Sequence, residues 1–443
     1  MKRKIFKEKW YPHLDIKKHF EKYEKWIKNA DWVAKHGFYP FIHYVMDLDK
    51  YKKDENGVRN LVPKKRDIFY ASHIDRYIYQ YYAKCLNDRY NLYAKNAGIN
   101  TAVIAYRDII KGKCNIDFAK EVFEFIAKHG CAYVFVGDFS SFFDNLDHAY
   151  LKNKLKNVYG TESLGAAEYA IFKSVTRYSY IELSDINDRM EELGKGDNVD
   201  KKKIEKYFST EEFHHFKGAA LKRNCESFGI PQGSPISAVY ANVYMVDFDK
   251  MLNDYVTSRK GLYRRYCDDI AIVIPMSDAE LSIEAFYDIV NKVDDIRSRI
   301  PRLGLNLDKT GKFVYMQGSF ESLASDRHVM SYLGFDFDGK CVSIRDKSLF
   351  KYYRRAYKKA KGVKFLKKMS FVDENYEKAY NAGRKALYKS YTHLGVSKNP
   401  YKYGNFLSYA YKAHRIFSSS NLLESNIRRQ IRRHWQKIEQ RLK

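Results

Sequence analysis

The sequence predicts an α+β protein of two or three lobes, and three observations favour this class. Its 443 residues exceed the length of one average domain. Hydrophobic residues make up 45% of the chain and aromatic residues 16%, which is enough to bury a sizeable core and excludes disorder of the whole chain. Short apolar segments typical of strands, at 131–138 and 268–275, alternate with segments that have helical spacing, such as AAEYAIFKSVTRY and AFYDIVNKVDDIRSRI.

Carboxylates stand at the ends of both predicted strands. Asp138 follows the apolar run YVFV, while Asp268 and Asp269 lie in RRYCDDIAIVIP, which predicts a tight turn between two strands. A lone aspartate at a strand end is usually a turn or cap residue. Two adjacent aspartates among buried apolar residues, however, repel each other unless a cation lies between them. The pattern therefore favours a site for two Mg²⁺ ions, about 3.5–4 Å apart, that supports phosphoryl transfer.

Between these strands lies a charged, weakly apolar stretch at 182–217, which predicts an inserted helical hairpin or an exposed loop. The six cysteines form no CxxC pair, so neither a zinc knuckle nor a disulfide scaffold is expected. The first residues, MKRKIFKEKW, lack the apolar segment of a signal peptide. No apolar run approaches the roughly 18 residues of a membrane span. We therefore expect a cytoplasmic protein without membrane association.

Positive charge is concentrated at the C-terminal end. The chain carries a net charge of +26, and residues 351–443 alone contain 24 Lys and Arg against 5 Asp and Glu. Apolar residues in this segment have helical spacing, for example Phe350, Tyr353, Tyr357 and Ala360. A lysine-rich helix is often simply a helix with one face in contact with solvent. Here, however, the basic bias extends over some ninety residues and is interleaved with aromatic residues, which favours a nucleic-acid clamp. The candidate nucleic-acid contacts are Lys358, Lys359, Arg428, Arg429, Arg432 and Arg433.

Several motifs, taken in order along the chain, resemble those of reverse transcriptases. The resemblance is closest to the bacterial branch that includes retron, group II intron and defence-associated enzymes. The motifs are VPKKRDIFYASHIDRYIYQ, AYRDIIKGKCNIDFA, DFSSFFDNLDH, GIPQGSPISAVYANVYM, the YCDD box, LGLNLDKT and SYLGFDF. YCDD alone recurs by chance, but this many motifs in the right order are specific.

The resemblance implies a right-hand polymerase fold with fingers, a palm built on an antiparallel sheet, and a helical thumb. The expected domains are an N-terminal helical extension at 1–60, fingers at 61–130, a palm with further fingers elements at 131–340, and a basic helical thumb at 341–443.

Carried over residue by residue, the resemblance assigns Asp138, Asp268 and Asp269 to catalysis and to the binding of two Mg²⁺ ions. Asp269 is the more dispensable carboxylate, and the backbone carbonyl of Phe139 is an expected further ligand. Phe143 matches the family's aromatic steric gate, which packs under the sugar of the incoming deoxynucleoside triphosphate and leaves no room for a 2′-hydroxyl. An RNA polymerase would need a polar group there. The alternative is a phenylalanine that simply packs in the core.

The motif IPQGSP places Gln232 at the floor of the implied nucleotide pocket, between small turn residues that let the backbone approach the nucleotide. Lys309, in LDKT, is implied to protonate the departing pyrophosphate, or is an exposed lysine after a strand. Four cations of the fingers are candidates for contact with the triphosphate. They are Lys64, Lys65, Arg66 and Arg76, of which the two arginines match the family pattern best.

The resemblance also implies a partner and a biological role. We expect a standalone bacterial enzyme that copies a structured non-coding RNA template into cDNA in defence against phage. This expectation rests on exclusion, since the chain ends after the thumb without an RNase H, integrase or endonuclease domain and lacks the retron signatures at the matching places. Two alternatives stay open: a retron or mobile-element reverse transcriptase, and a catalytically inert polymerase fold that only binds RNA. No oligomeric state is predicted.

Overall fold

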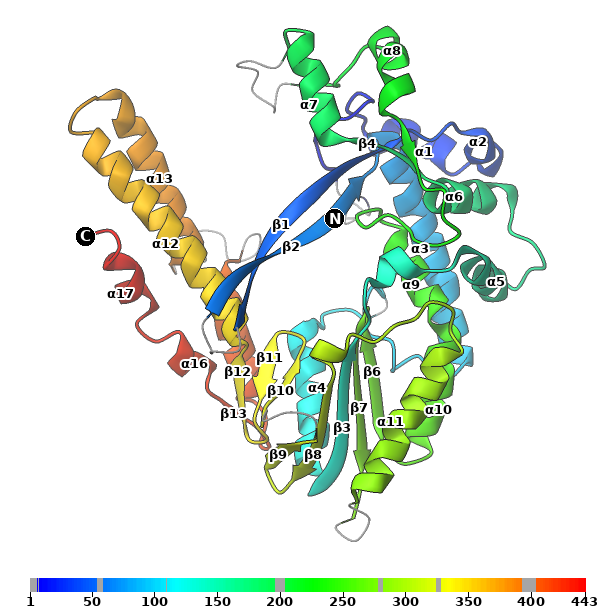
Figure 1. The fold of residues 1–443 in the computed structure, drawn as a ribbon, viewed down its shortest axis with the longest axis vertical. Helices are drawn as coiled ribbons and strands as arrows, with labels where there is room; N and C mark the ends of the chain where they lie inside the picture. The colour runs from blue at the N-terminus through cyan, green and yellow to red at the C-terminus, as the bar shows by residue number, and fades with distance from the viewer. Residues whose placement is uncertain are drawn as a thin grey trace. The chain divides into compact units, whose positions relative to one another are not determined.

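The computed structural model describes residues 6, 8–53, 59–108, 110–195, 204–277, 282–323, 328–392 and 404–443. The chain divides into two compact units, each assembled from segments that are separated in the sequence (Figure 1). The first unit comprises Met1–Ile110, Phe139–Asp254 and Asn291–Asn306, and the second comprises Lys111–Asp138, Tyr255–Val290 and Leu307–Lys443. Within the described ranges, no helix has both the length and the apolar character needed to cross a membrane.

The first unit is built on a four-stranded sheet with the order β2-β1-β4-β5. Its two long strands, β1 (Phe41–Lys53) and β2 (Arg59–Tyr70), pair antiparallel, and β1 also runs parallel to β4 (Ser179–Glu182). The unit's longest helix, α3 (His73–Asn96), buries every fourth residue from Ile78 to Ala94, which is the spacing that turns one helical face to a core. The remaining elements are α1 (Phe20–Ile27), α2 (Ala30–Lys35), η1 (Phe142–Asn145), α5 (His148–Tyr159), α6 (Ala166–Thr176), α7 (Leu183–Glu192), α8 (Thr210–Ala220), β5 (Lys222–Arg223) and α9 (Ser237–Tyr244).

The second unit contains a five-stranded antiparallel sheet with the order β6-β7-β3-β8-β9 and a smaller sheet with the order β10-β11-β12-β13. The central strand, β3 (Cys131–Asp138), is buried along its whole length. Ala132, Val134 and Val136 share a core with α4 (Asn115–Lys128), because alternate residues of a strand face the same side. On the other face, the ring of Tyr133 contacts that of Phe286 at 5.1 Å.

The other strands of this unit are β6 (Leu262–Tyr266), β7 (Asp269–Pro275), β8 (Gly311–Met316), β9 (Ser319–Ser322), β10 (Met330–Tyr332), β11 (Phe335–Phe337), β12 (Cys341–Ile344) and β13 (Glu424–Ser425). Its other helices are η3 (Leu307–Lys309), α12 (Asp346–Met369), α13 (Asn375–Tyr391), α15 (Phe406–Phe417), α16 (Ile427–Gln430) and α17 (His434–Glu439). Two helices, α10 (Val246–Thr257) and α11 (Ile283–Ser298), contain residues of both units.

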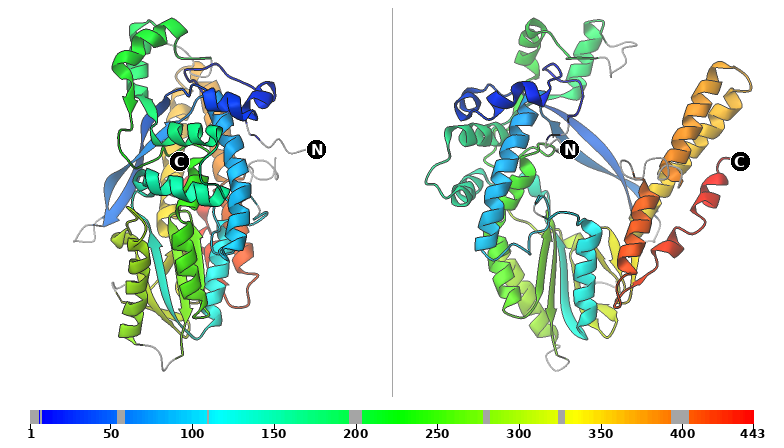
Figure 2. Two further views of the ribbon diagram at one scale, coloured as in Figure 1. Left: turned by 90° about the vertical axis from the view of Figure 1, so that its right-hand side faces the viewer. Right: turned by 180° about the vertical axis from the view of Figure 1, so that it is seen from behind.

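The helices expected in the C-terminal segment are present, and α12 and α13 run side by side (Figure 2). Of the residues whose spacing predicted a helix here, Ala360 is buried and Tyr357 packs against the same cluster, whereas Phe350 is 40% exposed. Ala356, Ala360 and Val363 pack with Leu387 of α13. Small residues at this contact allow the close approach of the two helices.

One segment differs from the expected domain division. The helical extension predicted for residues 1–60 is wrong over 41–53, which form β1; its aromatic and β-branched start, FIHYV, is typical of a strand.

The charged stretch at 182–217 was predicted to be a helical hairpin or an exposed loop, and it is helical where it is described. It contains α7 and most of α8, with residues 196–203 outside the described part. Ile186 and Met190 of α7 pack in one apolar cluster with Ile42 of β1.

Candidate active site

The three candidate carboxylates of the second unit lie at neighbouring strand ends. Strands β3 and β7 are neighbours in the sheet (Figure 1). Asp138 is the last residue of β3, and it pairs in register with Asp269, the first residue of β7. Asp268 precedes Asp269 in the turn that joins β6 to β7, as the sequence predicted. The antiparallel register of the sheet therefore brings together carboxylates that are about 130 positions apart in the sequence.

The turn that presents these carboxylates is held by a buried arginine. Cys267 has a φ of 60°, a left-handed conformation that is uncommon for residues other than glycine. Arg265, on β6, is 0% exposed and donates a hydrogen bond from Nη1 to the carbonyl oxygen of Cys267 at 2.9 Å. The guanidinium thus fixes the peptide that immediately precedes Asp268. Sequence reasoning missed Arg265, although an arginine inside an apolar strand before YCDD is a recognisable signal.

Negative charge accumulates at these strand ends. Burial raises the pKa of Asp268, and the nearby charge of Asp138 raises it further. Burial, followed by the charges of Asp268 and Asp138, raises the pKa of Asp269 to about 7. Lys309, on η3, places its ammonium group in direct contact with the Asp138 carboxylate. The carboxylates therefore attract cations, and the chain itself supplies Lys309 beside Asp138 and the charge of Arg345 near Asp269.

The donor set fits a hard divalent ion by its chemistry, since Mg²⁺ prefers carboxylate oxygens. Within the described ranges, no group of three or more His, Cys, Asp or Glu side chains is assembled closely enough to hold a metal ion. The predicted ligands Asp138, Asp268 and Asp269 are adjacent at the sheet edge, and a two-metal arrangement remains a proposal.

The first unit holds the candidate steric gate. Phe142 and Phe143 lie on η1, with Phe142 buried and Phe143 half-buried. Phe139, the residue expected to offer a carbonyl ligand, has its ring buried 5.5 Å from that of Phe248. Of the two adjacent phenylalanines, Phe142 accounts for core packing, which leaves Phe143 as the one with a partly accessible ring.

The PQG turn packs against both η1 and the end of β2. The amide of Gln232 donates from Nε2 to Oδ1 of Asp144 at 3.4 Å, and the carbonyl of Gln232 accepts from the backbone nitrogen of Phe69 at 2.8 Å. Gly233 has a φ of 120°, and a Cβ placed there would lie 2.4 Å from the carbonyl oxygen of Phe69. Only glycine fits this contact. The structure thus brings Gln232 next to the segment that carries Phe143.

The four candidate cations of the fingers have different environments. Lys65 and Arg66 are exposed on β2, and the side chain of Lys64 lies outside the described residues. Arg76 is 6% exposed, with its guanidinium 5.6 Å from the centre of the Tyr77 ring and hydrogen-bonded to Tyr11. The Arg76 side chain thus helps to pack the N-terminal segment onto α3, and its contact with a triphosphate stays a prediction.

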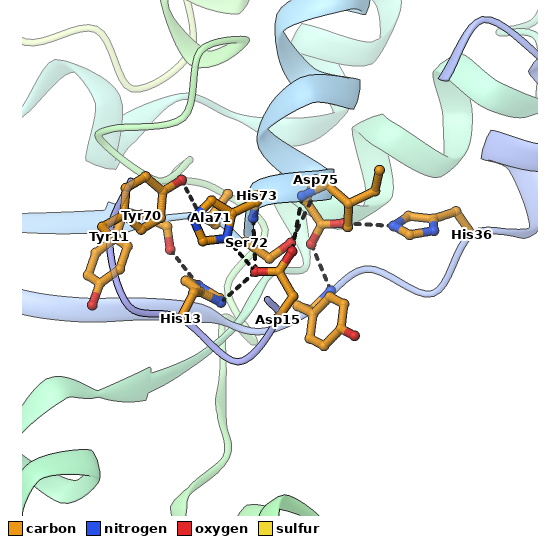
Figure 3. Close-up of polar contacts among 11 residues, drawn as sticks. Tyr11, His13, Asp15, His36, Tyr70, Ala71, Ser72, His73 and Asp75 are labelled. Carbon is orange, nitrogen blue, oxygen red and sulfur yellow. Dashed lines mark hydrogen bonds and ion pairs between the residues drawn. The ribbon is translucent and has the colours of Figure 1, made fainter. Parts of the chain in front are cut away.

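That packing rests on a buried polar network (Figure 3). Asp15 accepts hydrogen bonds from the backbone nitrogen and from Nδ1 of His73, at 3.1 and 2.8 Å. Ser72 caps the same helical turn by accepting a hydrogen bond from the backbone nitrogen of Asp75, and the Asp75 carboxylate lies 2.7 Å from Nε2 of His36. Because α3 follows directly after β2, the network holds the end of the strand that carries the exposed cations.

The candidate nucleic-acid contacts all lie in the second unit. Lys358 and Lys359 are on α12, the first exposed and the second half-buried. The four arginines at the C-terminal end are exposed, on α16 and immediately after it.

A sequence model of the reverse transcriptase (RNA-dependent DNA polymerase) family matches residues 64–337, more than half of the chain. The chain belongs to this family. The right-hand polymerase fold predicted from the order of motifs is thereby confirmed, and the matched span of this reverse transcriptase contains all three carboxylates and the PQG turn.

No curated protein matches this reverse transcriptase. Among solved structures, apo telomerase from Candida tropicalis, truncated from its C-terminal domain, is similar with 13% identity and a TM-score of 0.40, covering 71% of this chain and 57% of that chain. Telomerases from Candida tropicalis and Candida albicans in complex with a TWJ fragment of telomeric RNA have 12% identity and TM-scores of 0.38 and 0.37, covering 95% of this chain and 65% of theirs. The chain spans less than two thirds of the length of these telomerase chains.

Proposed function

We propose that this protein is an RNA-directed DNA polymerase that extends a primer by nucleotidyl transfer. The observation that carries the proposal is the cluster of Asp138, Asp268 and Asp269 at paired strand ends, within a chain that matches the reverse transcriptase family. Phosphoryl transfer requires little from a protein beyond positioning and neutralisation of charge. Three carboxylates gathered at paired strand ends meet that requirement once a cation is bound.

The three carboxylates would hold two Mg²⁺ ions, with the carbonyl of Phe139 as a further ligand. When bound, the ions would favour the ionised form of the primer 3′-hydroxyl and neutralise the leaving pyrophosphate. Arg265 keeps the turn before Asp268 in its left-handed conformation, so that the carboxylates need not rearrange. The ammonium of Lys309, held beside Asp138, can give a proton to the departing pyrophosphate oxygen.

The nucleotide would be selected by residues of the first unit. We propose that the half-buried ring of Phe143 packs under the sugar and excludes a 2′-hydroxyl. Gln232 would line the floor of the pocket, with its amide oriented by Asp144. Lys65 and Arg66, exposed on β2, would contact the triphosphate.

The narrower part of the proposal concerns the template and the role. We propose a bacterial enzyme of the defence-associated kind that copies a dedicated structured non-coding RNA into cDNA. The motif resemblance supports the branch, and the net charge of +26 supports an RNA partner.

The central test removes the carboxylates of the turn. With Mg²⁺, a primed RNA template and deoxynucleotides, the wild type should extend the primer, and the Asp268→Ala/Asp269→Ala variant should lose several orders of magnitude of activity. The matched control is Glu284→Ala/Asp288→Ala, which removes two exposed carboxylates from α11 in the same unit. Undiminished extension by the turn variant would overturn the assignment of the active site.

The role is tested in cells. RNA and DNA that copurify with the wild type and with the turn variant should be compared, with and without phage. One dominant RNA, a complementary DNA that only the wild type produces, and protection that needs catalysis are expected. A random sample of cellular RNA, or protection that persists in the variant, would refute the narrower proposal.

A further inference from the structure

A basic pocket of about 730 Å³ opens on the second unit, where α15, β13 and α16 meet. Four arginines line it: Arg428, Arg429, Arg432 and Arg433. Tyr411, on α15, also lines it and is 48% exposed. Its volume lies within the range of about 300–1,000 Å³ that is typical of ligand sites.

A short repeat in the sequence builds this pocket. Residues 427–434 read IRRQIRRH, so an isoleucine recurs at every fourth position and is followed by two arginines. Ile427 and Ile431 are buried in the core of the unit, and the arginine pairs are exposed. The side chain of Gln430 attaches the repeat to β12 through two hydrogen bonds. Its Oε1 accepts from the backbone nitrogen of Ile344 at 2.8 Å, and its Nε2 donates to the carbonyl oxygen of Ile344 at 3.0 Å. The arginines are therefore carried on an anchored segment.

The carboxylates of the pocket are already engaged. Asp338 accepts hydrogen bonds from the backbone nitrogens of Lys340 and Cys341, at 2.9 and 2.7 Å, and Glu424 lies 3.3 Å from the thiol of Cys341. Within the part of the chain that the structure describes, none of the four guanidinium groups makes a hydrogen bond or an ion pair.

Some exposed arginines elsewhere in the molecule are paired: Arg189 pairs with Glu192 at 2.6 Å, and Arg299 pairs with Asp295 at 3.0 Å. What distinguishes the pocket is that four arginines gather around one hollow.

We propose that this pocket binds single-stranded RNA, with the arginines on successive phosphates and the ring of Tyr411 stacked on a base. Guanidinium groups present planar, paired donors to phosphate oxygens. An aromatic face beside a basic groove is the arrangement by which single-stranded nucleic acids are held without reading their sequence. The pocket would anchor an unpaired segment of the template RNA.

The choice of RNA over a free phosphate compound rests on the proposed function, because a polymerase that copies RNA must retain it. The phosphate chemistry is common to RNA, nucleotides and polyphosphate. Tyr411 separates RNA and nucleotides from polyphosphate, since only ligands with bases gain from stacking, and the proposed function then favours RNA over a free nucleotide.

The first experiment measures binding of a labelled RNA hairpin with a single-stranded tail, at several salt concentrations. The test variant changes Arg428, Arg429, Arg432 and Arg433 to glutamine, and the double variant Arg428→Gln/Arg432→Gln provides a milder change. The matched control changes four exposed lysines of the same unit that lie outside the pocket to glutamine: Lys111, Lys113, Lys128 and Lys260.

The quadruple arginine variant should bind at least tenfold more weakly, and its log–log salt slope should fall by about 3, given about 0.7 per phosphate contact in a single strand. The control should change neither quantity to this extent. Equal effects in the test and control variants would overturn the proposal, because they would show a response to net charge alone.

The second experiment tests whether a base of the RNA stacks on Tyr411. Tyr411→Leu should weaken RNA binding about tenfold and leave competition by polyphosphate unchanged. If Tyr411→Leu has no effect and polyphosphate competes as well as RNA, the pocket binds phosphate compounds and the RNA proposal is wrong.

Extension of a short preformed RNA–DNA primer–template, at saturating concentration, is measured in parallel. The lysine control variant should retain it, and the pocket variants should need more primer–template to reach the wild-type maximal rate. Its loss in the pocket variants alone would place the arginines at the polymerase centre and refute a separate anchor. Its absence in the wild type would refute the proposed function instead.

Discussion

Replacing Gly233 by alanine tests whether the PQG turn is held as the structure shows. The backbone there has a φ of 120°, a region that costs a residue with a side chain about 1–3 kcal/mol. The new Cβ would also meet the carbonyl oxygen of Phe69 at 2.4 Å, and a backbone atom cannot rotate away. Together these effects should lower the free energy of unfolding by about 3 kcal/mol.

The same change should affect nucleotide binding. Relief of the clash moves the turn away from β2 and weakens the hydrogen bond between Phe69 and the carbonyl of Gln232. If the displaced turn weakens the binding of the nucleotide by about 1.4 kcal/mol, the KM for deoxynucleotides rises about tenfold, with a smaller change in kcat.

Thermal unfolding and steady-state primer extension measure the two effects. Gly218→Ala, on α8, is the control, since no neighbouring atom lies within 4 Å of the position that a Cβ would take there. It should be neutral or stabilise the protein by up to about 1 kcal/mol, because alanine favours a helix more than glycine does. If Gly233→Ala unfolds at the control's temperature and keeps the wild-type KM, the reasoning about this turn is refuted.

Two further predictions concern the sugar and the pH. Phe143→Val should admit ribonucleotides, because it opens space under the 2′-carbon of the sugar. The control Phe142→Val, in the core, should lower stability without changing the choice of sugar. Equal use of ribonucleotides and deoxynucleotides by the wild type would refute the steric gate. Burial lowers the pKa of His13 from 6.5 to about 4. Between these values the unfolded chain binds a proton that the folded chain does not, so the free energy of unfolding should fall as the pH falls through this window, by on the order of 3 kcal/mol in total. Calorimetry at pH 7 and pH 5 should show part of this loss, and His13→Gln should remove most of it; an equal loss in both proteins would contradict the assignment.

The strand-end positions of the carboxylates could be predicted because they depend on local patterns. An apolar run that ends at Asp138, and a turn between two apolar runs at Asp268, are visible in a few residues. The pairing of Asp138 opposite Asp269 could not be predicted from the pattern alone. Register between distant strands depends on how the whole core packs, and here it follows from the contacts of β3 with α4.

Burial of charged side chains could not be predicted from the sequence. The burial of Arg76 has no local signal, because its partner Tyr11 lies 65 positions earlier in a segment with no strong pattern. Arg265 was overlooked because arginines usually lie at the surface, although it holds the turn before Asp268. A buried cation is defined by the groups around it, and those groups come from distant parts of the chain.

The carboxylate cluster and the arginine pocket follow one physical rule. At the strand ends, the charges of Asp138 and Asp268 raise the pKa of Asp269, and Arg345 and Lys309 compensate only in part. In the pocket, four arginines are accompanied by two carboxylates, Asp338 and Glu424, so positive charge is in excess. Like charges that gather in excess over their counter-charges oppose folding, so each cluster is stabilised when a ligand of opposite charge binds. The negative charge of the carboxylate cluster calls for a divalent cation, and the positive charge of the arginine pocket calls for a polyanion. These are the two kinds of partner that a polymerase copying RNA needs.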